Sequence, residues 1–101
     1  MKKKKKKIYL SGPITGFDLV EREKAFSEEE RKFKSRGYDV FNCFKNGVPL
    51  SAPASEHLKA DMKMLPDCDT IYFMKGWEKS EGCNLEFNVA HALKLKMIFE
   101  R

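Results

Sequence analysis

The chain has 101 residues, which is enough for one hydrophobic core and one domain. Its 42% hydrophobic and 12% aromatic residues are typical of a globular protein rather than a disordered one. No apolar run approaches the about 18 residues that a membrane span requires, and no apolar segment of signal-peptide length follows the basic start. We therefore expect a cytoplasmic protein that makes no membrane contact.

The net charge of +5 arises from one segment. Lys2 to Lys7 contribute six positive charges, so the remaining residues carry a net charge of −1. Such a run can bind nucleic acid by neutralising phosphates, although a solvated tail is the more common case. Because no arginines and aromatics are interleaved after it, nucleic-acid binding is expected only through Lys2 to Lys7. We assign residues 1–7 to a basic run and residues 8–101 to a single domain.

Strand and helix signals alternate along the domain. Short apolar or alternating runs predict strands, and helical spacing of apolar residues predicts helices between them. The predicted strands cover residues 7–12, 38–42, 69–74 and 96–100, and the predicted helices cover residues 17–36, 55–65 and 83–95. Gly37 and Pro66 mark the ends of the first two helices.

Apolar residues at helical spacing identify the faces that we expect to be buried. These are Leu19, Val20, Phe26 and Phe33 in the first helix, and Leu85, Val89, Ala90, Ala92 and Leu93 in the third. Helices that alternate with short buried strands imply right-handed crossovers and a parallel sheet that is covered on both faces. The fold class is therefore α/β, a three-layer doubly wound sheet of about four strands.

In such sheets, ligands bind beyond the carboxyl ends of the strands, at the point where the strand order reverses. The loops after residues 10, 42 and 74 lie at that edge, so the segments "SGPITG", "NCFKNG" and "GWEKSEGCNLE" are expected to converge there. Neither G-x-G-x-x-G nor G-x-x-x-x-G-K-[ST] occurs, which disfavours the usual dinucleotide and triphosphate sites, and the absence of G-x-S-x-G disfavours a serine hydrolase.

The cysteines favour neither a disulfide framework nor a metal site. Cys43, Cys68 and Cys83 are odd in number, widely spaced and without a C-x-x-C pair. We expect reduced, buried or half-buried thiols, no metal and no cofactor.

Glu86 is the most informative carboxylate. It lies in the expected first turns of the third helix, near the point where the loops meet, and small residues such as Gly82 precede it and leave room for a ligand. The alternative is a surface residue that compensates the helix dipole. Ser80 and the N–H groups of the same helix start are candidates for holding an anion such as phosphate, or Ser80 simply caps the helix.

Three further residues have two interpretations each. Asp61 lies near the end of the second helix, where an acid is unfavourable for the dipole, so it is either functional or an exposed partner of Lys59, Lys63 or another nearby cation. Trp77 follows a strand and either stacks on a base or caps the core. Asp69 opens the third strand and is expected to fix a turn.

The stretches "IYLSGPITG", "GYDVFN", "D-x-x-x-L-x-x-C-D" and "GWEKSEGCNLEFNVAHAL" together resemble the nucleoside 2-deoxyribosyltransferase-like superfamily. The likeness is greatest to a small uncharacterised domain family that opens with the same SGPITG stretch. The resemblance implies a flavodoxin-like, or Rossmann-like, α/β fold. It also implies cleavage of the N-glycosidic bond of 2′-deoxynucleosides or their 5′-monophosphates, by hydrolysis or by deoxyribosyl transfer, and a homo-oligomer in which subunits share sites.

The resemblance assigns roles to individual residues. The glutamate of the S/D-x-G-x-x-x-E pattern, here Glu86, is the nucleophile; Asp61 assists protonation of the base, and Tyr9 lies near the nucleophile. Ser80, at a position where nucleoside transferases have aspartate and monophosphate hydrolases have serine, favours a phosphorylated substrate.

The remaining expectations concern the pocket and the alternatives to catalysis. The loop that begins with Ser11 and Gly12 helps to form the pocket, although it lacks the arginine that the hydrolases carry there. The alternatives are a non-catalytic nucleotide-binding module on the same fold and an interaction protein that engages nucleic acid through its lysines.

Overall fold

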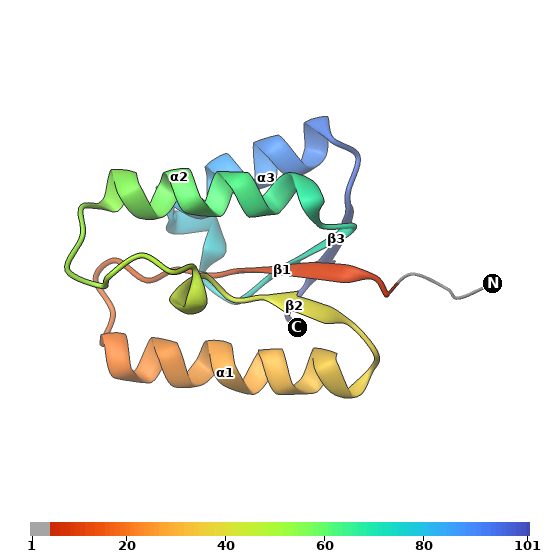
Figure 1. The fold of residues 1–101 in the computed structure, drawn as a ribbon, viewed down its shortest axis with the longest axis horizontal. Helices are drawn as coiled ribbons and strands as arrows, with labels where there is room; N and C mark the ends of the chain where they lie inside the picture. The colour runs from red at the N-terminus through yellow and green to blue at the C-terminus, as the bar shows by residue number, and fades with distance from the viewer. Residues whose placement is uncertain (1–4) are drawn as a thin grey trace.

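The computed structural model describes residues 5–101 and shows one parallel sheet between helices (Figure 1). The elements are β1 (Lys7–Ser11), α1 (Leu19–Ser35), β2 (Asp39–Phe41), α2 (Ala54–Met64), β3 (Thr70–Phe73), α3 (Glu81–Ala92) and β4 (Lys96–Phe99). Short 3-10 turns lie at Cys43–Lys45, Leu65–Asp67 and Trp77–Lys79. Lys2 to Lys4 of the lysine run lie outside the described residues.

The strand order is β2-β1-β3-β4, and every neighbouring pair is parallel. The order reverses between β1 and β3, where Leu10 pairs with Tyr72 and Ser11 with Phe73. The predicted α/β class, the four-stranded parallel sheet and its doubly wound arrangement are confirmed. The loops after β1 and β3 therefore leave the sheet side by side at the switch point.

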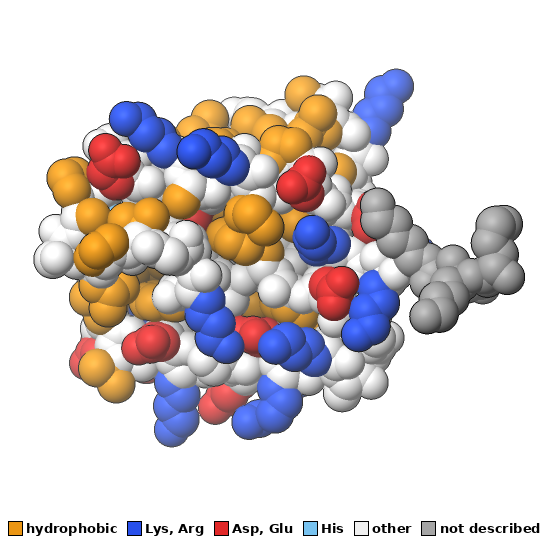
Figure 2. Space-filling view, in the orientation of Figure 1, with side chains coloured by type: hydrophobic (Ala, Val, Ile, Leu, Met, Phe, Trp, Pro, Cys, Tyr) orange, Lys and Arg blue, Asp and Glu red, His pale blue; other side chains and the backbone are white. Residues whose placement is uncertain are grey.

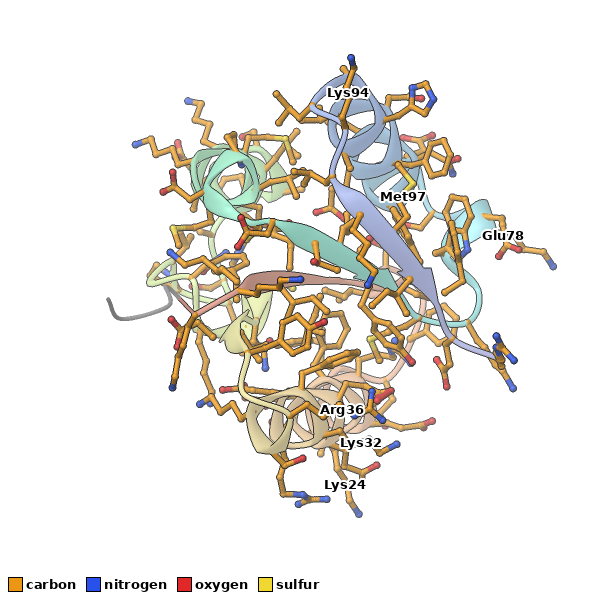
Figure 3. All side chains as sticks on the ribbon, turned by 90° about the vertical axis from the view of Figure 1, so that its right-hand side faces the viewer. Lys24, Lys32, Arg36, Glu78, Lys94 and Met97 are labelled. Atoms are coloured by element: carbon orange, nitrogen blue, oxygen red, sulfur yellow. The ribbon has the colours of Figure 1, made fainter. Side chains whose placement is uncertain are left out.

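Helices cover both faces of the sheet: α1 lies on one side, and α2 and α3 lie on the other (Figures 1 and 3). The alternation of side chains along the strands divides the core in two. The α1 side holds Ile8, Leu10, Phe26, Phe33, Tyr72 and Met74, and the other side holds Tyr9, Phe41, Leu65, Cys68, Ile71, Phe73 and Ala90. Because β1 and β3 are covered twice, nearly all of their residues are buried.

The buried face of α1 differs from the predicted one. Phe26 and Phe33 are buried as expected, but Val20 is 76% exposed and Leu19 is also exposed. The helix begins at Leu19 behind the N-cap Asp18, and its inner face is completed by Glu29 and Glu30. These two carboxylates are tolerated because Tyr72 donates to Glu29 and Asn42, Lys34 and Lys45 contact Glu30.

The apolar side predicted for α3 is also wrong in part. Leu85 and Leu93 are 40% and 48% exposed, whereas Cys83, Glu86 and Ala90 are buried. Burial of a glutamate at the centre of this face requires partners for its carboxylate, and β1 provides them. The helix starts two residues earlier than predicted, at Glu81, and ends at Ala92, where Lys94 adopts a φ of 60° and leads into β4 (Figure 3).

Asp69 has a structural role, but it does not fix a turn as expected: it accepts a hydrogen bond from the Lys7 N–H at 3.0 Å, which ties the start of β3 to β1. Gly37 ends α1 with a φ of 91°, a conformation that glycine adopts without strain. Within residues 5–101, no helix has the length and apolar character needed to cross a bilayer.

Candidate active site

A cavity of about 1210 Å³ opens at the carboxyl ends of the strands. Its lining comes from the loop after β1, the turn after β2, one side of α2, and the segment from Gly76 into α3. The predicted convergence of the three loops is therefore confirmed. The volume exceeds that of ordinary small-molecule sites, about 300–1,000 Å³, because one side of the cavity is open.

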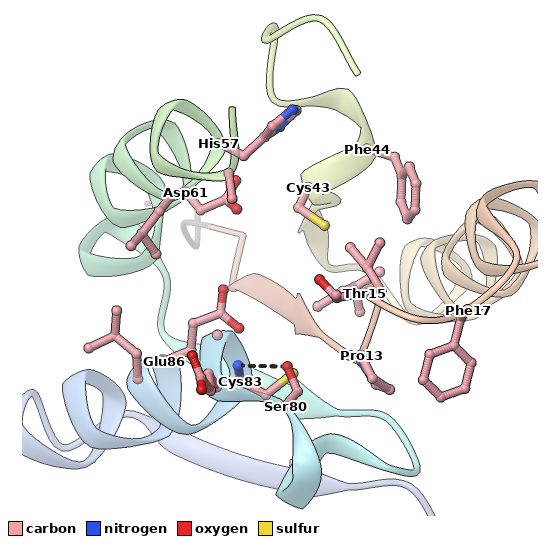
Figure 4. Close-up of a pocket in the computed structure, with 18 of the residues that line it drawn as sticks. Pro13, Thr15, Phe17, Cys43, Phe44, His57, Asp61, Ser80, Cys83 and Glu86 are labelled. Carbon is pink, nitrogen blue, oxygen red and sulfur yellow. Dashed lines mark hydrogen bonds between the residues drawn. The ribbon is translucent and has the colours of Figure 1, made fainter. Parts of the chain in front are cut away.

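Glu86 forms part of the inner wall of this cavity and is held from the central strand (Figure 4). The Tyr9 hydroxyl donates a short hydrogen bond to Oε2, and the Ser11 hydroxyl donates to Oε1 at 2.7 Å. Both donors are on β1 and face the same side of the sheet, since they are two residues apart. With 9% exposure, the carboxylate is oriented by both donors while it still reaches the cavity.

The burial of Glu86 affects its acidity. Desolvation raises the pKa of Glu86 to about 7; the hydrogen bonds from Tyr9 and Ser11 oppose this shift, and the charge of Asp61 adds to it. Desolvation and the Glu86 charge raise the pKa of Tyr9, so Tyr9 remains a phenol and a donor. Glu86 therefore changes between acid and carboxylate near neutral pH.

Asp61 lies on the α2 side of the cavity, together with His57, which is one turn earlier on the same helix (Figure 4). Asn46 donates to Asp61 Oδ1 at 3.1 Å and contacts His57 Nδ1 at 3.2 Å. Burial raises the pKa of Asp61, although the hydrogen bond from Asn46 reduces the shift. Lys59 pairs with Glu56, and no ion pair involves Asp61 in the described part of the chain, so the exposed-partner alternative is wrong.

Ser80 caps α3 at the opposite wall, where its hydroxyl accepts from the Cys83 N–H at 3.3 Å. Within residues 5–101, the N–H groups of Glu81 and Gly82 have no protein acceptor, as is usual in a first helical turn. A Cβ built on Gly82 would meet only the Ser80 Oγ, at 4.0 Å, so the space above this helix start is open.

Arg22 lies behind the loop that follows Ser11. Its guanidinium stands over the Phe17 and Phe26 rings at 5.4 and 5.6 Å. A Cβ on Gly12, which lines the cavity, would lie 3.1 Å from Arg22 Nη2 and 2.9 Å from Met74 Sδ, so Arg22 packs directly against the Gly12 backbone. Nε and Nη2 are buried without a hydrogen-bond partner in the described structure, an unfavourable state for a charged donor.

The structure does not bring every predicted site residue together. Glu86, Asp61, Ser80, Gly82 and Gly12 line the cavity, and Tyr9 and Ser11 support Glu86 from below. Trp77 instead packs on Phe73, Phe87 and Phe99 outside the lining, which is the position of a core cap. Cys83 and Cys43 also line the cavity, but burial raises the pKa of both thiols and keeps them protonated.

Three residues around the cavity were not predicted. His57 carried one signal, because it lies four positions before Asp61 and so shares its helix face. Asn46 lies in a loop and Arg22 in a charged helix, and neither pattern marks them in the sequence.

Solved structures share this arrangement of sheet and helices. The chain matches CMP N-glycosidase BcmB of Clostridium botulinum with a TM-score of 0.63 and 24% identity over 93% of this chain and 67% of that one. It matches the 2-deoxyribosyltransferase of Bacillus psychrosaccharolyticus with a TM-score of 0.71 and 19% identity over 92% of this chain and 70% of that one. It matches the 2-deoxyribosyltransferase of Leishmania mexicana with a TM-score of 0.72 and 20% identity over 93% of this chain and 63% of that one. The chain thus spans about two thirds of the length of these proteins.

These likenesses show that the chain has the fold of nucleoside 2-deoxyribosyltransferase-like proteins, as the resemblance implied. A family model described as "Domain of unknown function (DUF4406)" matches residues 6–99, so the chain belongs to that family. A search of curated proteins finds no match.

Proposed function

We propose that this protein cleaves the N-glycosidic bond of 2′-deoxynucleosides or their 5′-monophosphates, with Glu86 as the nucleophile. The observation that carries the proposal is the carboxylate of Glu86, which is buried at a cavity wall and fixed by Tyr9 and Ser11. A surface acid that merely compensates the helix dipole needs neither burial nor two side-chain donors from another element.

The proposed reaction follows the retaining glycosidase scheme. A Glu86 oxygen forms a bond to C1′ while the bond from C1′ to the base nitrogen breaks, and its electron pair leaves with the base. The proton that the base takes up comes from Asp61, whose pKa is raised by burial. Water or a second base then attacks C1′, gives its proton to Asp61, and releases the Glu86 carboxylate. The active state carries a proton on Asp61 and none on Glu86.

A 5′-phosphate is the group that best fits the wall opposite Asp61. Ser80 and the N–H groups of Glu81 and Gly82, which have no acceptor in the described structure, form a helix start that is suited to an anion. Arg22 adds a buried cation behind Gly12. Glu78 and Glu81 also line this part of the cavity, and their negative charges oppose a phosphate. Hydrogen bonds from Ser80 and the backbone N–H groups, rather than the overall charge, would therefore have to hold the phosphate.

The test is chromatography of free bases after incubation with deoxynucleosides and their 5′-monophosphates, next to the Glu86→Gln variant. We expect base release that disappears in the variant, and a preference for monophosphates. Tight binding of nucleotides without base release would replace this proposal with a non-catalytic nucleotide-binding module. A search for transfer uses the same assay with a second base added.

A further inference from the structure

The side chain of Asn46 joins two residues of the cavity wall, His57 and Asp61. Asn46 Oδ1 accepts a hydrogen bond from the Val48 N–H at 2.9 Å. This bond fixes which end of the amide is oxygen, so the Nδ2 group must face His57 and Asp61. Nδ2 carries two hydrogens, and it can donate one to Asp61 Oδ1 and the other to His57 Nδ1.

This geometry determines the tautomer of His57. A ring nitrogen that accepts a hydrogen bond carries no proton, so the neutral imidazole has its proton on Nε2. Within residues 5–101, Nε2 has no protein partner, yet it is not among the buried polar atoms that lack one. The Nε2–H group is therefore accessible, and His57 is a lining residue of the cavity. Asp61 Oδ2 likewise has no protein partner within residues 5–101 and is accessible.

We infer that His57 and Asp61 form the subsite for the departing base, in which Asn46 holds His57 as a neutral N–H donor. The inference rests on the proposed function and adds the residue that binds the leaving group. When the bond to C1′ breaks, negative charge develops on the base. The Nε2–H group donates a hydrogen bond to a ring nitrogen or carbonyl oxygen of the base, while Asp61 supplies the proton. A neutral imidazole suits this role because it polarises an acceptor without giving up its proton.

The tautomer can be tested without any activity. The chain has only two histidines, and His91 lies on α3 beside Phe87, outside the cavity lining. Nitrogen-15 NMR of the imidazoles, assigned with a His91→Gln variant, is expected to show a bare Nδ1 and a protonated Nε2 for His57. Asn46→Asp replaces the donor by an acceptor and should move the proton to Nδ1. If that variant does not fold, Asn46→Ser, which weakens the constraint, should give a mixture of tautomers.

Two NMR results would overturn the assignment. One is an Nδ1–H tautomer of His57 in the unmodified protein. The other is a tautomer that stays the same in both Asn46 variants.

The role in base binding has its own test, with free purine and pyrimidine bases as probes. Titration should shift the His57 signals and leave those of His91 unchanged. His57→Gln keeps a donor and should bind nearly normally, whereas His57→Phe should bind about three- to tenfold more weakly, the effect of one hydrogen bond. Deaza analogues that lack the contacted nitrogen should bind the unmodified protein more weakly but His57→Phe equally well.

The outcomes separate this inference from the proposed function. Base binding at His57 without any cleavage of nucleosides would support the subsite and reject the catalytic proposal. Unchanged kcat and KM in His57→Phe, alongside base release that depends on Glu86, would reject the subsite and keep the catalytic proposal.

Discussion

At the scale of single residues, the main feature of the site is that burial of Glu86 disfavours the ionised form of its carboxyl group. The folded protein holds the Glu86 proton up to a pH of about 7, whereas the unfolded chain releases it near 4.5. Between these values the folded state binds more protons than the unfolded state, so stability falls as pH rises through this window. The shift in the pKa of Glu86 lowers the free energy of unfolding by about 3 kcal/mol at pH 8.

Replacement of Glu86 by glutamine should remove this pH dependence. We expect Glu86→Gln to be inactive and, at pH 8, more stable than the unmodified protein by up to about 3 kcal/mol, because no charge is buried. Urea denaturation of both proteins at pH 5, 6, 7 and 8 measures the difference. Glu30, whose pKa is lowered to about 2, titrates below this window in both proteins and cancels. Parallel stability curves would contradict the account.

The Tyr9 hydroxyl should act through the acidity of Glu86. Tyr9→Phe keeps the ring that stacks on Phe41 but removes a donor that stabilises the carboxylate. A hydrogen bond to a charged group is worth about 1.5–3 kcal/mol, so the pKa of Glu86 should rise further by about one to two units. The acidic limb of the kcat/KM profile should move up by that amount, with activity partly restored at alkaline pH. A uniform loss at every pH would indicate a merely structural role.

At the scale of elements, the start of α3 should select the substrate. Ser80→Asp keeps a good N-cap, so the stability of the helix should be retained, but it places a negative charge where the phosphate would lie. We expect cleavage of monophosphates to fall at least tenfold while cleavage of free deoxynucleosides changes little. Ser80→Ala, which loses the cap without adding charge, is the matched control. Equal losses for both substrate classes in Ser80→Asp would contradict a phosphate subsite here.

The order of strands and helices could be predicted because its signals are local. Period-two and helical spacing, Gly37 and Pro66 all act within a few residues. Which face of each helix is buried was harder to predict, because burial depends on partners that are distant in the sequence. Glu29, for example, is buried beside Tyr72, which lies 43 positions away. Apolarity alone therefore assigned Leu85 and Leu93 to the core when both are exposed.

The contacts within the candidate site also depend on residues that are far apart in the sequence or on loop conformation. The pairing of Tyr9 with Glu86 spans 77 positions and was suggested only by the resemblance to a known superfamily. The link from Asn46 to His57 and Asp61 depends on the conformation of the loop at residues 46–48, which periodicity does not describe. The position of Arg22, whose Nε and Nη2 lack a hydrogen-bond partner within residues 5–101, follows from packing against the Gly12 loop, and nothing in the charge pattern of α1 distinguishes Arg22 from its neighbours.

At the scale of the whole molecule, exposed apolar side chains collect around the cavity. Figure 2 shows such side chains over the left-hand end, where the loops follow the strands. The exposed large hydrophobic residues that line the cavity are Phe17, Leu19, Leu50, Leu58 and Leu85. Because the resemblance implies a homo-oligomer in which subunits share sites, we propose that a second copy of the chain covers this apolar rim.

Light scattering after gel filtration tests this association. The unmodified protein should be a dimer or larger, and Leu50→Asp should shift it toward the monomer and lower activity, because the open side of the cavity loses its cover. Val20→Asp is the control, since Val20 is 76% exposed but lies outside the cavity lining. A monomeric unmodified protein with full activity would contradict the proposal.

The attack of Glu86 on C1′ can be observed by trapping the covalent intermediate. The protein is mixed with the substrate that releases base fastest, quenched in acid within a turnover, and analysed by mass spectrometry before and after digestion. We expect a mass increase of one deoxyribosyl group, or of its 5-phosphate, on the peptide that contains Glu86, and none in Glu86→Gln. An adduct on another residue, or base release with no adduct and inverted configuration at C1′, would contradict it.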